Sequence, residues 1–128
     1  MTETNPNLFE LIDRGDTAGL EAALAAGADA DAAGRGGQPA LGYAAARGDL
    51  TALRLLLGHG ASVERSGEAG NTALMEAAAR GHLEVVQALL QAGADPAQCN
   101  KWGFGAADWA EWPANAVEIR ALLQAGGR

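Results

Sequence analysis

The largest aromatic side chains gather near the C-terminus, in residues 100–113, which hold Trp102, Phe104, Trp109 and Trp112. Only two aromatic residues lie elsewhere in the chain. Tryptophan side chains at protein interfaces commonly cost about 2 kcal/mol or more of binding free energy when they are truncated. The cluster therefore indicates part of a core, a cap over the end of a core, or a surface that binds a partner.

The combinations of residues typical of enzymes and metal sites are absent from the sequence. The two histidines are His59 and His82, and no serine is spaced from them as in a catalytic triad; there is also no metal-binding histidine pair or phosphate-binding loop. Cys99 is the single cysteine, which excludes an internal disulfide and a cysteine-based zinc site. We therefore expect a non-enzymatic protein with no catalytic residues, no metal and no cofactor.

Composition and charge limit the class of partner. The 128 residues are 48% hydrophobic and 20% charged, which is typical of one globular domain. The net charge of −7 would repel a phosphate backbone, so we expect a neutral or basic partner and no nucleic acid. No apolar run could span a bilayer, and the N-terminus lacks the basic leader of a secretory signal. With one cysteine, these features predict a cytoplasmic protein that does not bind membranes.

The sequence repeats with a period of 33 residues. This step relates the members of three series of glycines: Gly15, Gly48 and Gly81; Gly27, Gly60, Gly93 and Gly126; and Gly37, Gly70 and Gly103. A period of this length indicates a stack of short units. Each unit buries its apolar faces against its neighbours, so the stack is the folding domain.

Each period predicts two short helices. In the third period, Thr72 is a favourable N-cap for a helix whose apolar face includes Leu74 and Ala78. Gly81 ends that helix, because glycine adopts the left-handed conformation without steric cost, and Gly93 ends the next one. The N-cap position of the second helix falls, in successive periods, on Asp16, Asp49, His82 and Asn115. All of these except the histidine are strong N-caps.

The stretch GNTALMEAAARGHLEVVQALLQAGAD resembles the ankyrin repeat, whose usual pattern is G-x-T-P-L-H-x-A-A-x-x-G-H-x-x-V-V-x-x-L-L-x-x-G-A-D. The resemblance covers the chain from about residue 5 to residue 128. It implies an all-α fold, an α-solenoid of four ankyrin repeats with eight short antiparallel helices and β-turn fingers. We expect a single domain over residues 1–128, with repeats at about 5–33, 34–66, 67–99 and 100–128. The first and last repeats would act as caps.

Two departures from the family pattern affect the turns. The histidine of T-P-L-H, which in the family ties neighbouring turns by hydrogen bonds, is absent from every repeat. The aspartate that usually opens the turn is replaced by Gly34, Gly67 and Asn100. We therefore expect looser β-hairpin fingers than the family norm, with the packing of the helices unaffected.

The resemblance implies a protein–protein interaction module that binds its partner on a concave face. In the family this face comprises the turn tips and the exposed side of each first helix. The matching positions give the candidate partner-binding residues Trp102, Phe104, Trp109, Trp112, Tyr43, Arg47, Glu76 and Arg80.

Three arginines of the concave face recur at the 33-residue step: Arg14, Arg47 and Arg80. They could form a ladder of guanidinium groups for an acidic partner. Internal pairing is the favoured interpretation, because each has a suitable partner four residues earlier, namely Glu10, Tyr43 and Glu76. Two of these are ion pairs worth about 0.2–0.5 kcal/mol each, and the third is a cation–π contact.

Two interpretations of the aromatic cluster remain open. The core of the last repeat is supplied by other residues, among them Ala106 and Ile119, which favours a binding surface. The rings could instead fill space in a repeat that carries Pro113, has Ala114 in place of the C-cap glycine, and has Ala107 in place of leucine. The chain is expected to be a monomer. A homodimer paired through the rings, or a sensor of small molecules or peptides, is an alternative.

Overall fold

The computed structural model describes residues 7–34, 37–109 and 116–126. Within these residues the chain is all-helical, and its only β-structure is two isolated bridges, Ala33↔Pro39 and Cys99↔Gly105. The helices are α1 (Leu8–Arg14), α2 (Thr17–Ala25), α3 (Ala40–Arg47), α4 (Leu50–Gly58), α5 (Ala73–Arg80), α6 (Leu83–Gln91), α7 (Ala106–Trp109) and α8 (Ala116–Gly126). The predicted all-α solenoid is confirmed.

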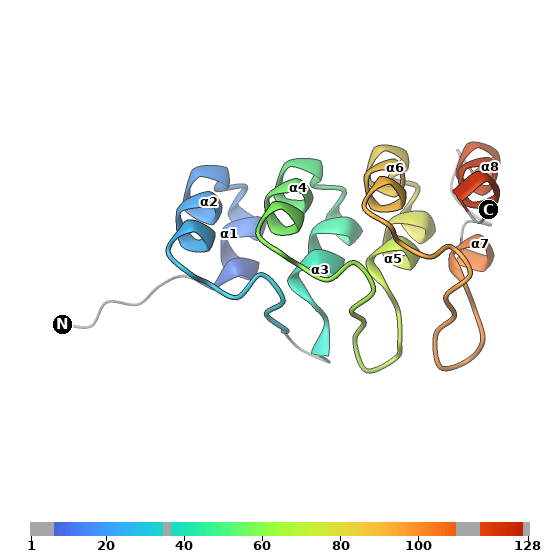
Figure 1. Cartoon of the computed structure of the whole chain (residues 1–128), viewed down its shortest axis with the longest axis horizontal. Helices are drawn as coiled ribbons and strands as arrows, with labels where there is room; N and C mark the ends of the chain where they lie inside the picture. Colours follow the sequence, from blue (N-terminus) through green and yellow to red (C-terminus); the bar gives the residue numbers. More distant parts are fainter. Residues whose placement is uncertain (1–6, 35–36, 110–115, 127–128) are drawn as a thin grey trace.

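The helices form two layers (Figure 1). One row contains α1, α3, α5 and α7, and the other contains α2, α4, α6 and α8. Each helix contacts the next member of its own row, as α3 contacts α5 and α4 contacts α6. Long loops connect the repeats and project beyond the α1–α7 row (Figure 1). We name them finger 2 (residues 26–39), finger 3 (59–72) and finger 4 (92–105), after the repeat that each one opens.

Small side chains allow neighbouring repeats to pack closely. Ala44 and Ala45 on α3, and Ala77 and Ala78 on α5, are completely buried. The described helices are only 4 to 11 residues long, and isolated helices of that length are marginal in water. Their stability therefore comes from burial between repeats rather than from helix propensity.

The predicted ends of the first helices are confirmed. Gly15, Gly48 and Gly81 follow α1, α3 and α5 with φ angles of 70°, 72° and 77°, in the left-handed region. Thr72 caps α5, because its Oγ1 accepts a hydrogen bond of 3.4 Å from the backbone N–H of Met75.

The N-cap positions of the second helices differ between repeats. Asp16 accepts a hydrogen bond from Gly19 N–H, and Asp49 accepts one from Ala52 N–H, as the sequence predicts. His82 makes no such bond. Its Nε2–H instead donates to the backbone carbonyl of Ala46 in the preceding repeat, at 3.0 Å. The fourth position, Asn115, lies outside the described residues.

A periodic hydrogen bond ties successive fingers together. The Asp31 carboxylate accepts bonds from the backbone N–H and the hydroxyl of Ser62, at 2.7 and 3.0 Å. One period later, Glu64 accepts a bond of 2.6 Å from the backbone N–H of Asp95. The same carboxylate position therefore links finger 2 to finger 3 and finger 3 to finger 4.

We expect Gly48→Ala to destabilise the protein more than Gly15→Ala. Both substitutions place a side chain at positive φ, which costs about 1–2 kcal/mol. At Gly48 the new Cβ would also lie 2.6 Å from His82 Nδ1, whereas at Gly15 nothing lies within 4 Å. Urea unfolding followed by circular dichroism measures both losses. Equal losses would mean that the His82 ring moves aside without cost.

Candidate partner-binding site

The candidate residues that the structure describes lie on finger 4 and on helices of the α1–α7 row. We call the outward side of this row, together with finger 4, the concave face, after the surface predicted from the family. Its candidate residues are distributed as Tyr43 and Arg47 on α3, Glu76 and Arg80 on α5, Trp109 on α7, and Trp102 and Phe104 on finger 4. Trp112 lies outside the described residues.

The candidate residues on α3 contact residues of α1, in the preceding repeat. The Tyr43 hydroxyl hydrogen-bonds to the Asp13 carboxylate, and this bond raises the pKa of Tyr43 above its ordinary value. Arg47 forms an ion pair of 3.2 Å with Asp13 and lies 5.9 Å from the Tyr43 ring centroid, so the predicted cation–π contact is confirmed. The Phe9 ring meets Tyr43 edge-on at 5.3 Å. Tyr43 and Arg47 therefore join repeats as well as face outward.

One of the two predicted ion pairs within a helix is present. Arg80 lies 3.7 Å from Glu76 on α5, as predicted. Glu10 and Arg14, both within the described residues, form no ion pair, so that prediction is wrong. The Glu76 side chain is 20% exposed. Burial raises the pKa of Glu76, and the nearby Arg80 guanidinium opposes that shift.

Finger 4 is held by a buried asparagine. Asn100 Oδ1 accepts hydrogen bonds from the backbone N–H groups of Trp102 and Phe104, at 2.9 and 3.0 Å. Its Nδ2 group donates to Asn71 Oδ1 on finger 3, at 2.9 Å. The Lys101 backbone N–H adds a bond of 3.0 Å to the carbonyl of Ala69. The Asn100 amide therefore supplies an acceptor within finger 4 and a donor to finger 3.

The aromatic residues divide into an exposed pair and a half-buried ring. Trp102 is 64% exposed and Phe104 is 50% exposed. Trp109 is half-buried, packs against the core and meets Phe104 edge-on at 6.1 Å. The Lys101 ammonium lies 6.0 Å from the Trp102 ring centroid. Trp109 thus fills space at the last repeat, while Trp102 and Phe104 face solvent.

A hollow of about 260 Å³ opens beside Trp109; we call it the Trp109 hollow. Its lining residues are Asn71, Met75, Glu76, Ala79, Arg80 and Trp109. The indole Nε1 of Trp109 is buried and has no hydrogen-bond partner within the described residues. A second depression adjoins the hollow, because it shares Asn71, Glu76 and Arg80 and extends to Glu68 on finger 3. The structure therefore brings three candidate residues, Glu76, Arg80 and Trp109, together around one opening.

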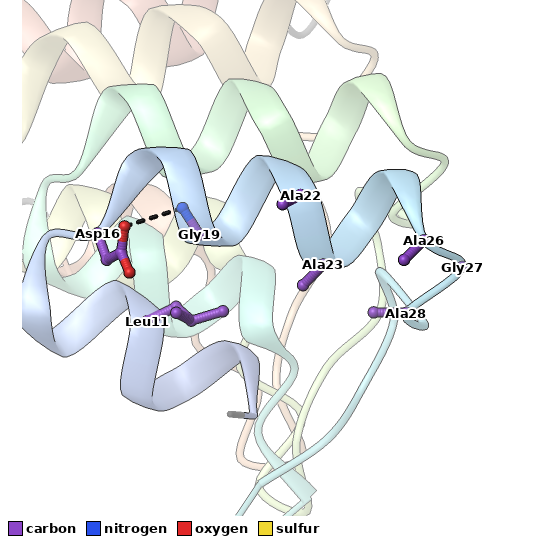
Figure 2. Close-up of a pocket in the computed structure, with 8 residues that line it drawn as sticks. All are labelled: Leu11, Asp16, Gly19, Ala22, Ala23, Ala26, Gly27 and Ala28. Carbon is purple, nitrogen blue, oxygen red and sulfur yellow. Dashed lines mark hydrogen bonds between the residues drawn. The ribbon is translucent and has the colours of Figure 1, made fainter. Parts of the chain in front are cut away.

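A larger hollow of about 510 Å³ lies at the first repeat (Figure 2). Gly19 in its lining is half-buried, whereas Ala52 and Val85, one and two periods later, are fully buried. This hollow therefore marks the end of the stack where no described repeat covers α2. Its ionisable lining residue, Asp16, is engaged in capping α2 through Gly19, at 2.8 Å (Figure 2). The hollow at the first repeat therefore lacks the converging polar groups of a specific binding site.

Sequence reasoning missed the roles of Asp13, Asn71 and Asn100. Nothing in the sequence paired Asp13 with Tyr43 or Asn71 with Asn100. A signal for Asn100 existed, because asparagine can accept hydrogen bonds from the backbone in a turn much as aspartate does. In the part of the chain that the structure describes, no His, Cys, Asp and Glu side chains are grouped as metal ligands, and no helix is long and apolar enough to cross a bilayer.

Glu76→Gln should gain stability relative to the wild type as the pH rises. The folded protein binds a proton at Glu76 more readily than the unfolded chain does, because the pKa of Glu76 is raised on folding. Raising the pH from the unfolded pKa, about 4.3, through the folded pKa therefore lowers the stability of the wild type relative to the glutamine variant. Urea unfolding of both proteins at about pH 4 and about pH 7 measures the difference. If the variant instead loses stability relative to the wild type at the higher pH, attraction to Arg80 outweighs burial.

Asn100→Ala is expected to cost about 1–3 kcal/mol, because two hydrogen bonds from the backbone N–H groups of finger 4, each worth about 0.5–1.5 kcal/mol, are lost. Asn100→Asp keeps the acceptor oxygen and should cost less. Urea unfolding gives both values, and amide hydrogen exchange at Trp102 and Phe104 reports the order of the finger. Equal stability and exchange in the two variants would show that the side chain does not hold finger 4.

Comparison with known proteins agrees with this architecture. A family model described as ankyrin repeats, in three copies, matches residues 8–100. A search of curated proteins gave no match. The matched residues include α1 to α6, and α7 and α8 stack against α5 and α6 beyond them. The chain belongs to the ankyrin-repeat family.

Proposed function

We propose that this chain is a non-catalytic module that binds a partner protein through its concave face, with the main contacts around finger 4. Ankyrin repeats are generally protein–protein interaction modules, and the family is typically non-catalytic. The location rests on one observation, the exposure of Trp102 and Phe104 on an ordered finger.

The distribution of exposed apolar side chains supports this location. Among the described residues, the exposed large hydrophobic side chains are Trp102, Phe104 and Val117, and two of these three lie on finger 4. The hydrogen bonds of Asn100 hold the finger in place before binding. A preordered loop loses less entropy on binding than a flexible one, so more of the contact energy appears as affinity.

The remaining candidate residues are assigned different roles in this proposal. Trp109, Glu76 and Arg80 line the hollow beside the exposed rings. Tyr43 and Arg47 already bind Asp13, so they form the edge of the surface. Trp112 is kept as a candidate from sequence alone. With a net charge of −7, the protein is suited to a neutral or basic partner in the cytoplasm, without a cofactor, nucleic acid or membrane.

Trp102→Ala should weaken binding of the partner by about 30-fold or more, the loss expected for a tryptophan anchor worth about 2 kcal/mol. Phe104→Ala should also weaken binding. Val117→Ala is the matched control, because Val117 is 80% exposed on α8, in the other helical row. The measurement is calorimetric titration with the purified native partner. Unchanged affinity in both finger 4 variants, with normal folding, would exclude finger 4 as the anchor.

The same exposed rings also favour a second candidate, a homodimer that buries them against each other. Sedimentation equilibrium at micromolar concentration distinguishes the homodimer from a monomeric partner-binding module. A dimer that buries these rings should dissociate in the Trp102→Ala variant and persist in the Val117→Ala variant. A monomeric wild type would exclude the dimer.

A further inference from the structure

We propose that the Trp109 hollow binds one uncharged amide group of the partner, as part of an extended peptide segment that also covers Phe104. This inference rests on the proposed protein-binding function and adds the chemistry of the group that enters the hollow.

The hollow presents hydrogen-bond donors that lack an acceptor. The indole Nε1–H of Trp109 is buried and unpaired within the described residues, and a buried donor without a partner costs about 1–3 kcal/mol. Asn71 also lines the hollow, and because Asn100 uses its Oδ1 atom, its Nδ2 group is the part of the amide that can still donate. A carbonyl oxygen placed here would satisfy the indole.

The hollow also presents one acceptor whose charge is already balanced. The Glu76 carboxylate lies 3.7 Å from Arg80, which is longer than a hydrogen bond, so its oxygens retain capacity to accept. Glu76 and Arg80 together carry no net charge. A charged group would therefore gain little net attraction from the pair, and it would lose its hydration on entering the hollow. An amide matches both needs, because its carbonyl accepts from Trp109 while its N–H donates to Glu76.

Size and surroundings favour a peptide over a free small molecule. Sites for small molecules usually occupy about 300–1,000 Å³. The Trp109 hollow, at about 260 Å³, suits one group of a larger ligand. Phe104 contacts the Trp109 ring edge-on and is half exposed, so an apolar side chain next to the bound amide can pack on it.

The test uses three probes with the same leucine side chain. N-acetyl-leucine N-methylamide is neutral, N-acetyl-leucine carries a carboxylate, and leucine N-methylamide carries an ammonium group. Each is titrated into the ¹⁵N-labelled full chain, and the indole N–H signal of Trp109 is followed by NMR. Trp109→Phe assigns that signal by its loss. If that variant does not fold, Trp102→Phe and Trp112→Phe assign it by elimination.

The neutral probe is expected to shift the Trp109 indole signal more than either charged probe at equal concentration. In a folded Trp109→Phe variant, its binding, followed on the Asn71 amide signal, should weaken by about two- to tenfold, the effect of one hydrogen bond. Glu76→Gln leaves Arg80 without its carboxylate, so N-acetyl-leucine should become the strongest probe. Glu68→Gln, in the adjoining depression, is the control and should leave the order of the probes unchanged.

Two results would overturn the inference: an indole signal that none of the probes moves, or one that a charged probe moves most in the wild type. Either result, combined with loss of partner binding in Trp102→Ala, would leave the proposed function intact. A clear response to the neutral probe, combined with unchanged partner binding in Trp102→Ala and Phe104→Ala, would instead support the hollow and refute the proposed surface.

Discussion

Close contact between consecutive repeats is the interaction on which the rest of this structure depends. The helices are too short to persist alone, so each repeat exists only because its apolar faces are covered by its neighbours. Fully buried alanines on α3 and α5 allow that contact. Polar contacts between the helices and between the fingers of consecutive repeats strengthen it. His82 bonds to the backbone of Ala46, and the carboxylate position of Asp31 and Glu64 bonds to the following finger. Apolar burial supplies the stability, and these hydrogen bonds set the alignment of one repeat on the next.

The candidate site is a direct product of this stacking. The Trp109 hollow has walls from finger 3, α5 and α7, which belong to two different repeats. The Trp109 ring packs against the core, while its Nε1 atom has no hydrogen-bond partner among the residues that the structure describes. Trp102 and Phe104 are held outward by Asn100, which is itself buried between the fingers. The residues proposed to bind the partner therefore include some that also stabilise the last repeat.

Most predictions from the sequence that had a local cause succeeded, and the Glu10–Arg14 pair is the exception. The glycine ends of α1, α3 and α5, the caps at Thr72 and Asp49, and the Glu76–Arg80 pair involve residues within a few positions of each other. They were incomplete where a distant residue supplied a further partner. Arg47 pairs with Asp13 across two repeats as well as contacting Tyr43, and His82 bonds to the preceding repeat instead of capping its own helix.

The sequence by itself determined the repeat, its two helices and the family, because a 33-residue period and left-handed glycines follow from residue type and spacing alone. It also identified the aromatic residues that could bind a partner. Only the tertiary structure decided which of them face solvent and which fill the core, and that Glu76, Arg80, Asn71 and Trp109 surround one hollow. The physical reason is that the exposure and the hydrogen-bond partners of a side chain depend on which residues of the neighbouring repeat lie beside it. Residues about 30 apart in sequence become neighbours only when the stack forms.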